Sequence, residues 1–177
     1  LQKKDPHYIY VGERQGIKIQ GFDLGNSPSG VATYATLEGK TIVHTTSAGV
    51  QGIVNAKNAS EIITGSLVNA KAVASYIKMK NPEYVSLVPM GLNGTEDSAE
   101  DEICASYIKA LLLGENPNIH NEIASLKESA GKKFFNPQKR EHFPMPDFFM
   151  CLVPNIFNFV IKANTTGPYI EMEKIEL

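Results

Sequence analysis

The sequence predicts an α/β fold in which a largely parallel or mixed sheet is covered by helices, giving three layers. Short apolar runs rich in Val, Ile and Tyr alternate with segments of helical apolar spacing, and such alternation is typical of βαβ units. The runs lack the strict apolar–polar alternation of strands with one solvated face, which favours burial on both faces. Two further apolar runs close the chain and predict a C-terminal β-hairpin.

Six apolar runs are predicted to be strands. They are Tyr8–Val11, Thr41–Thr46, Glu61–Gly65, Tyr84–Met90, Phe157–Ala163 and Tyr169–Ile175. We expect the second, third and fourth runs to be central, mainly parallel neighbours, because helix-like segments lie between them. We expect the last two runs to pair with each other, because Asn164–Pro168 between them has the composition of a turn.

Five segments are predicted to be helical. They are residues 48–59, 69–80, 98–113, 118–129 and 147–152. The second segment is clear because it carries an apolar stripe at helical spacing. That stripe consists of Ala70, Val73, Ala74 and Ile77. The third segment has Ser98 as a candidate N-cap, acidic residues in its first turn and Gly114 as a stop signal.

Composition is that of a globular domain, and we treat residues 1–177 as one domain. Hydrophobic residues make up 42% and charged residues 20% of the 177 residues, and the formal net charge is −2. Lys and Arg are scattered rather than clustered, which argues against a nucleic-acid partner. No apolar run is long enough to cross a bilayer. Cys104 and Cys151 lie far apart in the sequence, so we expect buried, unbridged thiols in the cytoplasm.

Glycine-rich polar loops follow several of the predicted strands. They are Gly12–Gly16, Gly21–Pro28, Ser47–Gly49 and Gly91–Asp97. In an open α/β sheet, ligands bind in the crevice beyond the carboxyl ends of the strands. Loops that follow neighbouring strands are therefore expected to converge on one site.

The side chains of these loops suit an anion. Arg14 offers a planar cation for phosphate, sulfonate or carboxylate, and Gly21 and Gly25 allow close approach of the backbone. Neutral donors come from Asn26 and Ser27 and from the strand end at Thr45, Thr46 and Ser47.

Carboxylates near the same loops are hard oxygen donors of the kind that Mg²⁺ uses. They are Glu13, Asp23, Glu100 and Asp101. Each has a structural alternative: Asp23 and Asn26 are common in turns, and Glu100 and Asp101 complement a helix N-terminus. The four histidines, at positions 7, 44, 120 and 142, lack metal-ligand spacing and are expected to be structural or solvated. From these residues alone, the sequence predicts an α/β domain that binds an anion.

One pattern resembles a known family. Gly12-Glu13-Arg14 followed by the octad Gly-Phe-Asp-Leu-Gly-Asn-Ser-Pro at 21–28 is similar to the signature of the 2-phosphosulfolactate phosphatases. Further similar segments occur in the same order along the chain. They are Thr45-Thr46, Gly65-Ser66 with Asn69-Ala70, Glu100-Asp101 with Cys104-Ala105, Asp147-Phe148 and Phe159-Val160.

The resemblance implies Mg²⁺-dependent hydrolysis of the phosphate ester of 2-phospho-3-sulfolactate, a step towards coenzyme M. Together with the loop chemistry, it implies three groups of site residues. The catalytic group is Glu13, Arg14 and Asp23; the substrate-binding group is Arg14, Gly25, Asn26, Ser27, Thr45, Thr46 and Ser47; the metal-binding group is Asp23, Glu100 and Asp101. The partner is a small phosphorylated acid, and a homo-oligomer is compatible with the sequence.

Three departures from the family pattern keep alternatives open. The family has Thr-Thr-Asn-Gly-Thr where this chain has residues 45–49, and Cys-Ala-Gly where it has residues 104–106. Family members also carry a strand and an Asp-x-x-Arg-Ala motif before the Gly-Glu-Arg loop, so we expect roughly 50 to 70 further residues before Leu1 in the native protein. The alternatives are a phosphatase of another phosphorylated hydroxy acid and a non-catalytic anion-binding protein of the same fold.

Overall fold

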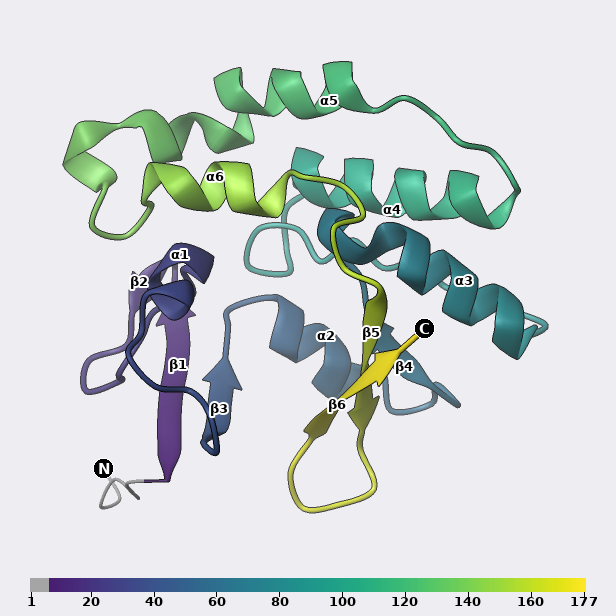
Figure 1. The fold of residues 1–177 in the computed structure, drawn as a ribbon, viewed down its shortest axis with the longest axis horizontal. Coiled ribbons are helices and arrows are strands. Elements are labelled where there is room, and N and C mark those ends of the chain that lie inside the picture. Colours follow the sequence, from purple (N-terminus) through teal and green to yellow (C-terminus); the bar gives the residue numbers. More distant parts are fainter. Residues whose placement is uncertain (1–6) are drawn as a thin grey trace.

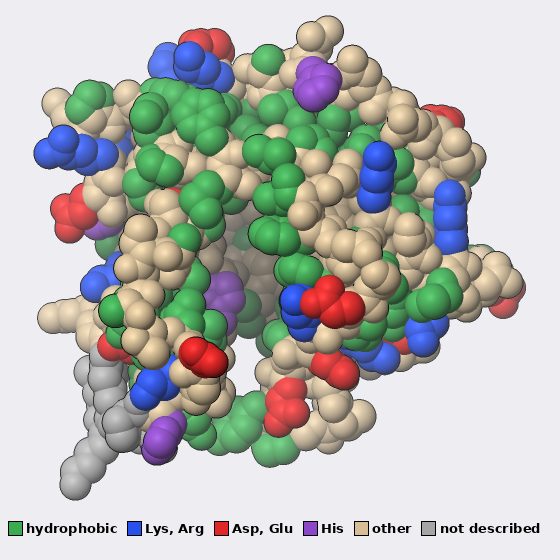
Figure 2. Space-filling model, viewed as in Figure 1, with side chains coloured by type: hydrophobic (Ala, Val, Ile, Leu, Met, Phe, Trp, Pro, Cys, Tyr) green, Lys and Arg blue, Asp and Glu red, His purple; other side chains and the backbone are tan. Residues whose placement is uncertain are grey.

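A computed structural model describes residues 7–177 as a mixed α/β structure with two three-stranded sheets (Figure 1). The first sheet has the order β2-β1-β3, and the second has the order β4-β5-β6. In Figure 1, most of the helical segments lie above the two sheets. The space-filling view of the same face is hollowed near its centre, between the two sheets (Figure 2).

The first sheet is built around β1. This strand, Tyr8–Arg14, turns back through Gln15 and Gly16 into the short antiparallel β2, Ile17–Lys18, and pairs in parallel with β3, Thr41–Thr45. The φ values of Gln15 and Gly16 are 54° and 78°, and positive φ at both central residues is the signature of a type I′ turn. The predicted first strand is confirmed, and β2 was not predicted.

Gly12 sets the close approach of β1 and β3. It faces Thr45 in the parallel register, and a Cβ atom built on Gly12 would lie 2.5 Å from the carbonyl oxygen of Thr45. That distance is far inside van der Waals contact, so a side chain at position 12 would push the two strand ends apart. The ends of β1 and β3 are therefore held close together where the loops that follow them begin.

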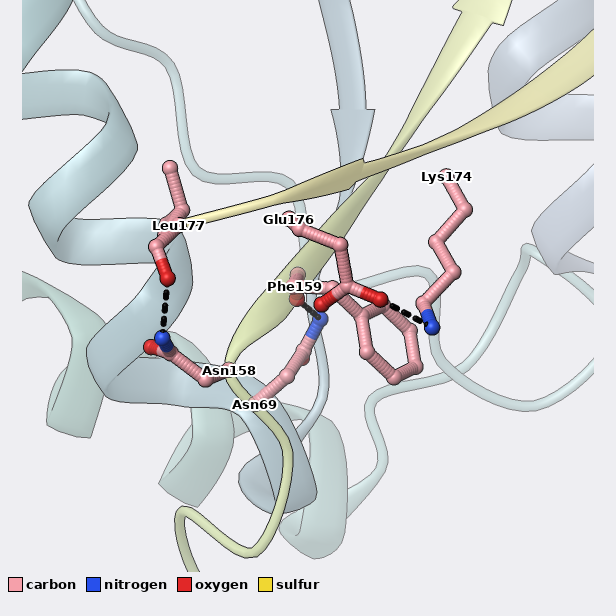
Figure 3. Close-up of polar contacts among 6 residues, drawn as sticks. All are labelled: Asn69, Asn158, Phe159, Lys174, Glu176 and Leu177. Carbon is pink, nitrogen blue, oxygen red and sulfur yellow. Dashed lines mark hydrogen bonds and ion pairs between the residues drawn. The ribbon is translucent and has the colours of Figure 1, made fainter.

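The second sheet is antiparallel throughout. It consists of β4 (Ile62–Thr64), β5 (Phe159–Asn164) and β6 (Glu171–Glu176). The predicted C-terminal hairpin is confirmed as β5–β6. Beside its open end, the side chain of Asn158 donates to the carbonyl oxygen of Leu177, as Figure 3 shows.

Asn69 ties the second sheet to the helices. Its side-chain NH₂ donates to the carbonyl oxygen of Phe159 at 3.1 Å (Figure 3), and its side-chain oxygen accepts from the N–H and hydroxyl of Ser66, both at 3.0 Å. Asn69 is buried, so these bonds satisfy a polar group that would otherwise be costly to bury. The Gly65–Ala70 segment, which resembles the family, therefore has a structural role here.

Helical segments occupy most of the remaining chain. The α-helices are α1 (Pro28–Ala32), α2 (Gly49–Asn55), α3 (Ala70–Lys80), α4 (Ala99–Leu112), α5 (His120–Ser125) and α6 (Met145–Cys151). The 3₁₀ turns are η1 (Leu67–Asn69), η2 (Leu126–Glu128), η3 (Ala130–Phe135) and η4 (Pro137–Lys139). The five predicted helices are confirmed as α2 to α6, with α2 and α5 shorter than expected.

The main core lies where α3 packs against β5 and α4. Ala70 and Val160 are fully buried at its centre, and Val73 and Ile108 are nearly so. Three of the four residues of the predicted apolar stripe are buried, and Ile77 packs against the same cluster. Helical spacing of apolar residues therefore identified the face of α3 that stabilises the fold through the hydrophobic effect.

Two predictions about the sheet are wrong. Tyr84–Met90 forms no strand, and Tyr84 and Val88 are 83% and 69% exposed. Pro82 and Pro89 lack the N–H that a ladder needs, and no strand within residues 7–177 pairs with this segment. The runs at 41–46, 61–65 and 84–90 are also not neighbours, because β3 pairs with β1 and β4 pairs with β5. An apolar run is compatible with a strand, but the run alone fixes neither the strand nor its partner.

Within residues 7–177, none of the helices has the length and apolar character needed to cross a membrane.

Candidate functional site

The carboxylate of Glu13 joins the ends of β1 and β3. Its Oε1 accepts from the backbone N–H of Ser47 at 2.6 Å, and its Oε2 accepts from the hydroxyl of Ser47 at 3.0 Å and from the N–H of Gly16 at 2.7 Å. Glu13 is only 8% exposed. This buried carboxylate therefore fixes the β1–β2 turn against the segment that follows β3. We call this set of contacts the Glu13 clamp.

The environment of Glu13 favours its charged form. Burial raises the pKa of this carboxyl, but the backbone N–H groups of Gly16 and Ser47, the hydroxyl of Ser47 and the charge of Arg14 together outweigh burial and lower the pKa. Glu13 is therefore ionised at neutral pH and acts as the acceptor of the clamp.

Arg14 extends from the clamp toward β3. Its Nη1 donates to the carbonyl oxygen of Glu13 at 2.7 Å, and its Nη2 donates to Oγ1 of Thr45 at 3.1 Å. The residue is exposed, so its guanidinium combines a fixed position with access to solvent. The N–H of Gln15 adds a bond to the hydroxyl of Ser47 at 3.0 Å. A planar cation held at the strand ends in this way can bind a phosphate or carboxylate group.

The octad loop, Gly21–Pro28, lies along the same end of β1. Asp23 accepts from the N–H of Tyr10 through Oδ2 at 2.9 Å, and the N–H of Gly12 donates to the carbonyl oxygen of Leu24 at 3.0 Å. Both contacts are made to β1 itself. The octad loop and the Glu13 clamp are therefore held by the same strand.

His44 connects β3 to the octad loop. Its Nε2 lies 3.1 Å from Oδ1 of Asn26. The surrounding protein lowers the pKa of His44 by desolvation, while the charge of Glu13 raises it in part. His44 is therefore predominantly neutral at pH 7. The sequence predicted only a structural or solvated role for His44. Its position directly before the predicted substrate-binding residues Thr45–Ser47 was the only feature that could have pointed to the site.

Ser27 begins α1 as its N-cap. Its Oγ accepts from the N–H of Gly30 at 3.0 Å, which is the usual capping bond. The N–H of Ser29 donates to Oδ1 of Asp147 at 2.8 Å, and Asp147 is 4% exposed. Asp147 thereby anchors the first turn of α1, directly after the octad loop, to α6. The sequence did not predict this contact, although Asp147 lies in a segment that resembles the family.

Thr46 has a similar local role at the start of α2. Its Oγ1 accepts from the N–H of Val50 at 3.1 Å, while Thr45 and Ser47 on either side contact Arg14 and Glu13. The polar group predicted at the end of β3 is thus close to Arg14, Glu13 and, through His44, to Asn26. Substrate binding by these residues and by Gly25 stays a prediction.

Glu100 and Asp101 lie in the first turn of α4. Oδ2 of Asp101 accepts from the N–H of Gly91 at 2.7 Å, and Oε2 of Glu100 is buried without a hydrogen-bond donor. Burial and the charge of Glu100 raise the pKa of Asp101. The hydrogen bond from Gly91 and the charge of Lys133 lower it, but the net effect is a raised pKa. An added positive charge would stabilise this pair of carboxylates.

The Glu100–Asp101 pair approaches the clamp only through intervening side chains. A Cβ atom on Gly16 would meet the ring of Phe143 at 2.5 Å. The Nζ of Lys133 lies 5.5 Å from the centroid of that ring, and its charge acts on Asp101. No hydrogen bond joins the two sets within residues 7–177, and that part of the chain contains no cluster of three or more metal-ligating side chains.

Comparison with known proteins decides the family. A family profile described as 2-phosphosulpholactate phosphatase matches residues 1–164. The chain belongs to the 2-phosphosulfolactate phosphatase family. A protein of Bacillus subtilis named probable 2-phosphosulfolactate phosphatase is 30% identical over 179 residues, which cover 99% of this chain and 76% of that protein.

Two further relatives carry the same name. The protein of Carboxydothermus hydrogenoformans is 45% identical over 112 residues, covering 63% of this chain and 45% of that protein. The protein of Caldicellulosiruptor saccharolyticus is 36% identical over 140 residues, covering 77% and 57% respectively. The chain therefore spans about half the length of these two curated relatives of the 2-phosphosulfolactate phosphatase family.

The two cysteines of this family member differ in environment. Burial, with a contribution from the charge of Asp101, raises the pKa of Cys104 to about 11, so its thiol stays protonated at neutral pH. A protonated thiol is a weak nucleophile. Neither cysteine forms a disulfide, but Cys104 is half-buried and Cys151 is exposed, so the prediction of buried side chains is wrong for Cys151 and only partly met by Cys104. Cys151 is the last residue of α6.

Proposed function

We propose that this chain is a Mg²⁺-dependent phosphatase that hydrolyses the phosphate ester of a small acid such as 2-phospho-3-sulfolactate. The family assignment supports the proposal, and the Glu13 clamp is the structural observation that carries it. The clamp fixes Arg14 beside Thr45 at the end of β3. A cation and neutral donors, oriented before the substrate arrives, are what stabilises a phosphoryl group as charge develops on it.

Within this proposal, Arg14 binds the phosphate or another anionic group of the substrate. Thr45, already 3.1 Å from its guanidinium, and Asn26 and Ser27 of the octad loop supply neutral donors. Gly25 lets the backbone approach the same group. These residues account for binding and orientation without invoking a phosphoenzyme.

The two carboxylates of the proposed catalytic group have different tasks. All three hydrogen bonds of Glu13 are used inside the clamp, so we assign it the positioning of Arg14 and Ser47. Asp23 is partly exposed in the octad loop, and we assign it the acceptance of a proton from the attacking water, a role in general base catalysis.

Glu100 and Asp101 fit a divalent cation in one respect. Glu100 has a buried oxygen without a donor, and Asp101 lies next to it. Mg²⁺ uses one or two carboxylates and completes its shell with water, so we propose that these two residues hold it. The predicted third ligand, Asp23, would act on it only through a bridging water, since no cluster of three ligating side chains occurs within residues 7–177. A bound Mg²⁺ would supply polarisation of the phosphoryl oxygens.

The proposed site offers a cation and neutral hydrogen-bond donors. The phosphate, carboxylate and sulfonate groups of the proposed substrate are all anionic acceptors for such groups. The family assignment favours 2-phospho-3-sulfolactate, which would place the reaction in the cytoplasm on the route to coenzyme M. The sequence at 47–49 differs from the family pattern, and this favours another phosphorylated hydroxy acid as the alternative substrate.

A non-catalytic anion-binding protein is the second candidate function. It is favoured by the separation of the metal-binding carboxylates, since no cluster of three occurs within residues 7–177. In that case Arg14 and the octad loop would bind an anion without turnover.

Release of inorganic phosphate tests the proposal. The purified protein is incubated with 2-phospho-3-sulfolactate, phosphoglycolate or p-nitrophenyl phosphate, with Mg²⁺ or with EDTA. We expect Mg²⁺-dependent release that Asp23→Asn lowers by a factor of about 100 or more. The matched control Asp97→Asn, at an exposed position, should leave the rate of phosphate release unchanged. Phosphate binding without turnover would establish the non-catalytic alternative, and equal turnover by Asp23→Asn would remove Asp23 from the mechanism.

A further inference from the structure

A second concave surface lies on η2, η3 and η4, and four lysines line it. They are Lys127, Lys132, Lys133 and Lys139. We call this surface the lysine basin. Its volume is about 550 Å³, which is within the usual range of small-molecule sites. Figure 2 shows Lys and Arg side chains beside hydrophobic ones over the upper-left corner, where Figure 1 places η3.

The backbone beneath the basin is rigidly packed. Leu126 of η2 is 1% exposed, and a Cβ atom on Gly131 of η3 would lie 2.2 Å from the ring of Phe148 on α6. The rings of Phe135 and Phe148 meet edge to face at 5.0 Å. The turns that carry Lys127, Lys132 and Lys133 therefore pack against a partly buried aromatic cluster.

The charges of the basin are only partly compensated by the protein, because the charge of Lys133 acts on Asp101. One carboxylate, Glu128, lines it beside the four lysines, and none of those lysines forms an ion pair within residues 7–177. The whole chain has a net charge of −2, so this concentration of positive charge is local. Gathering like charges raises the free energy of the fold, and a concave surface focuses their field on one volume.

Neighbouring groups shape the basin for a phosphorylated ligand. Nζ of Lys127 lies 5.1 Å from the centroid of the Phe135 ring, a cation–π contact that holds the ammonium at the wall. The side-chain oxygen of Asn136 accepts from the N–H of Gln138 at 2.9 Å, which orients its NH₂ group as a donor. Lysine ammonium groups and an amide NH₂ are all donors, and phosphoryl oxygens are acceptors.

We infer that the lysine basin binds a compact polyanion with two or more phosphoryl groups, such as a di- or triphosphate. A single phosphate would reach only part of a basin with four lysines. A nucleic acid needs basic residues along an extended surface, whereas here they line one open concave surface. The inference does not depend on the phosphatase activity, because the basin shares no residue with the Glu13 clamp.

Calorimetric titration with pyrophosphate tests the inference on the purified protein. We expect pyrophosphate to bind at the lysine basin, and the double variant Lys132→Ala/Lys139→Ala should weaken this binding by about tenfold or more, since hydrogen bonds to charged groups are lost. The matched control is Lys57→Ala/Lys109→Ala, which removes the same charge from exposed positions outside the basin. It should bind pyrophosphate as the unchanged protein does. If the double variant melts early, Lys132→Arg/Lys139→Arg should keep the binding.

Three results would overturn the inference. They are the absence of any heat of binding, equal weakening in the basin and control variants, and tighter binding of a single-stranded oligonucleotide than of pyrophosphate through the same lysines. The variants also separate this site from the proposed active site. Lys132→Ala/Lys139→Ala should lose pyrophosphate binding, while Asp23→Asn should keep it whether or not the chain proves to be a phosphatase.

Discussion

Ser47 donates two hydrogen bonds to the carboxylate of Glu13, one from its backbone N–H at 2.6 Å and one from its hydroxyl at 3.0 Å. The residues are 34 positions apart in the sequence, so this contact fixes the end of β1 to the segment after β3. Arg14 and Thr45 lie beside this contact in the sequence and are joined by a hydrogen bond of 3.1 Å. The proposed site therefore depends on the charge and reach of one buried side chain.

Replacing Glu13 should destabilise the protein in a pH-dependent way. Glu13→Gln keeps an acceptor but places an NH₂ group against an N–H donor, and we expect a loss of about 1–3 kcal/mol in the free energy of unfolding at pH 7. The folded pKa of Glu13 lies below its ordinary value of 4.5, so its contribution is present above that pH and lost as the pH falls through the folded pKa.

Urea unfolding between pH 3 and pH 7 checks this. The difference between the unchanged protein and Glu13→Gln should shrink on the acid side, whereas the control Glu171→Gln, at an exposed position of β6, should show no difference at any pH. A difference in the free energy of unfolding that stays constant from pH 3 to pH 7 would show that the clamp does not depend on the charge of Glu13.

Gly12→Ala should separate the strand ends. The added Cβ atom would lie 2.5 Å from the carbonyl oxygen of Thr45, and relieving such a contact typically costs about 1–3 kcal/mol. Gly49→Ala is the control, because the nearest atom to its Cβ would be Oγ1 of Thr46 at 3.7 Å. Thermal unfolding should show a lower Tm for Gly12→Ala only; equal Tm values would mean that the strands adjust freely.

Arg14→Lys should impair substrate binding although the charge is kept. Lysine lacks the planar fork that reaches both the carbonyl of Glu13 and the hydroxyl of Thr45. We expect the KM for the phosphate ester to rise by about tenfold, with a smaller change in kcat. Arg140→Lys, at an exposed arginine of the same chain, is the control. Steady-state kinetics in which both variants match the unchanged protein would exclude Arg14 from binding.

Mg²⁺ should stabilise the protein through Glu100 and Asp101. Excess MgCl₂, compared with KCl at equal ionic strength, should raise the Tm by about 3 °C or more, because an ion that binds only the folded state stabilises it. Glu100→Gln/Asp101→Asn should abolish this response. The control is Glu102→Gln/Asp97→Asn, which removes the same charge from exposed positions nearby. A response that persists in Glu100→Gln/Asp101→Asn would place the metal elsewhere.

The ring of His44 should titrate below its ordinary pKa of 6.5, because desolvation opposes its charged form. The pKa should fall further in Glu13→Gln, since the charge of Glu13 raises it in the unchanged protein. Proton–nitrogen NMR of the imidazole between pH 4.5 and pH 8 measures both values. A higher pKa in Glu13→Gln would contradict this account of the electrostatics. Glu171→Gln again serves as the control.

The sequence by itself determined the elements that depend on local pattern. The apolar stripe of α3 is repeated within consecutive helical turns, and the acidic start of α4 with Gly114 beyond its end requires only neighbouring residues. The β5–β6 hairpin was also predictable, because Asn164–Pro168 brings two adjacent runs together. The octad loop pointed to the family without any knowledge of its contacts.

The tertiary structure decided the contacts between segments that are distant along the chain. A strand forms only where a second edge completes its hydrogen bonds, so β4 joined β5 and Tyr84–Met90 joined nothing within residues 7–177. His44 meets Asn26, and Asp147 meets Ser29 across 118 positions. Such contacts depend on where buried polar groups find partners once the apolar faces have packed, and no spacing in the sequence records that outcome.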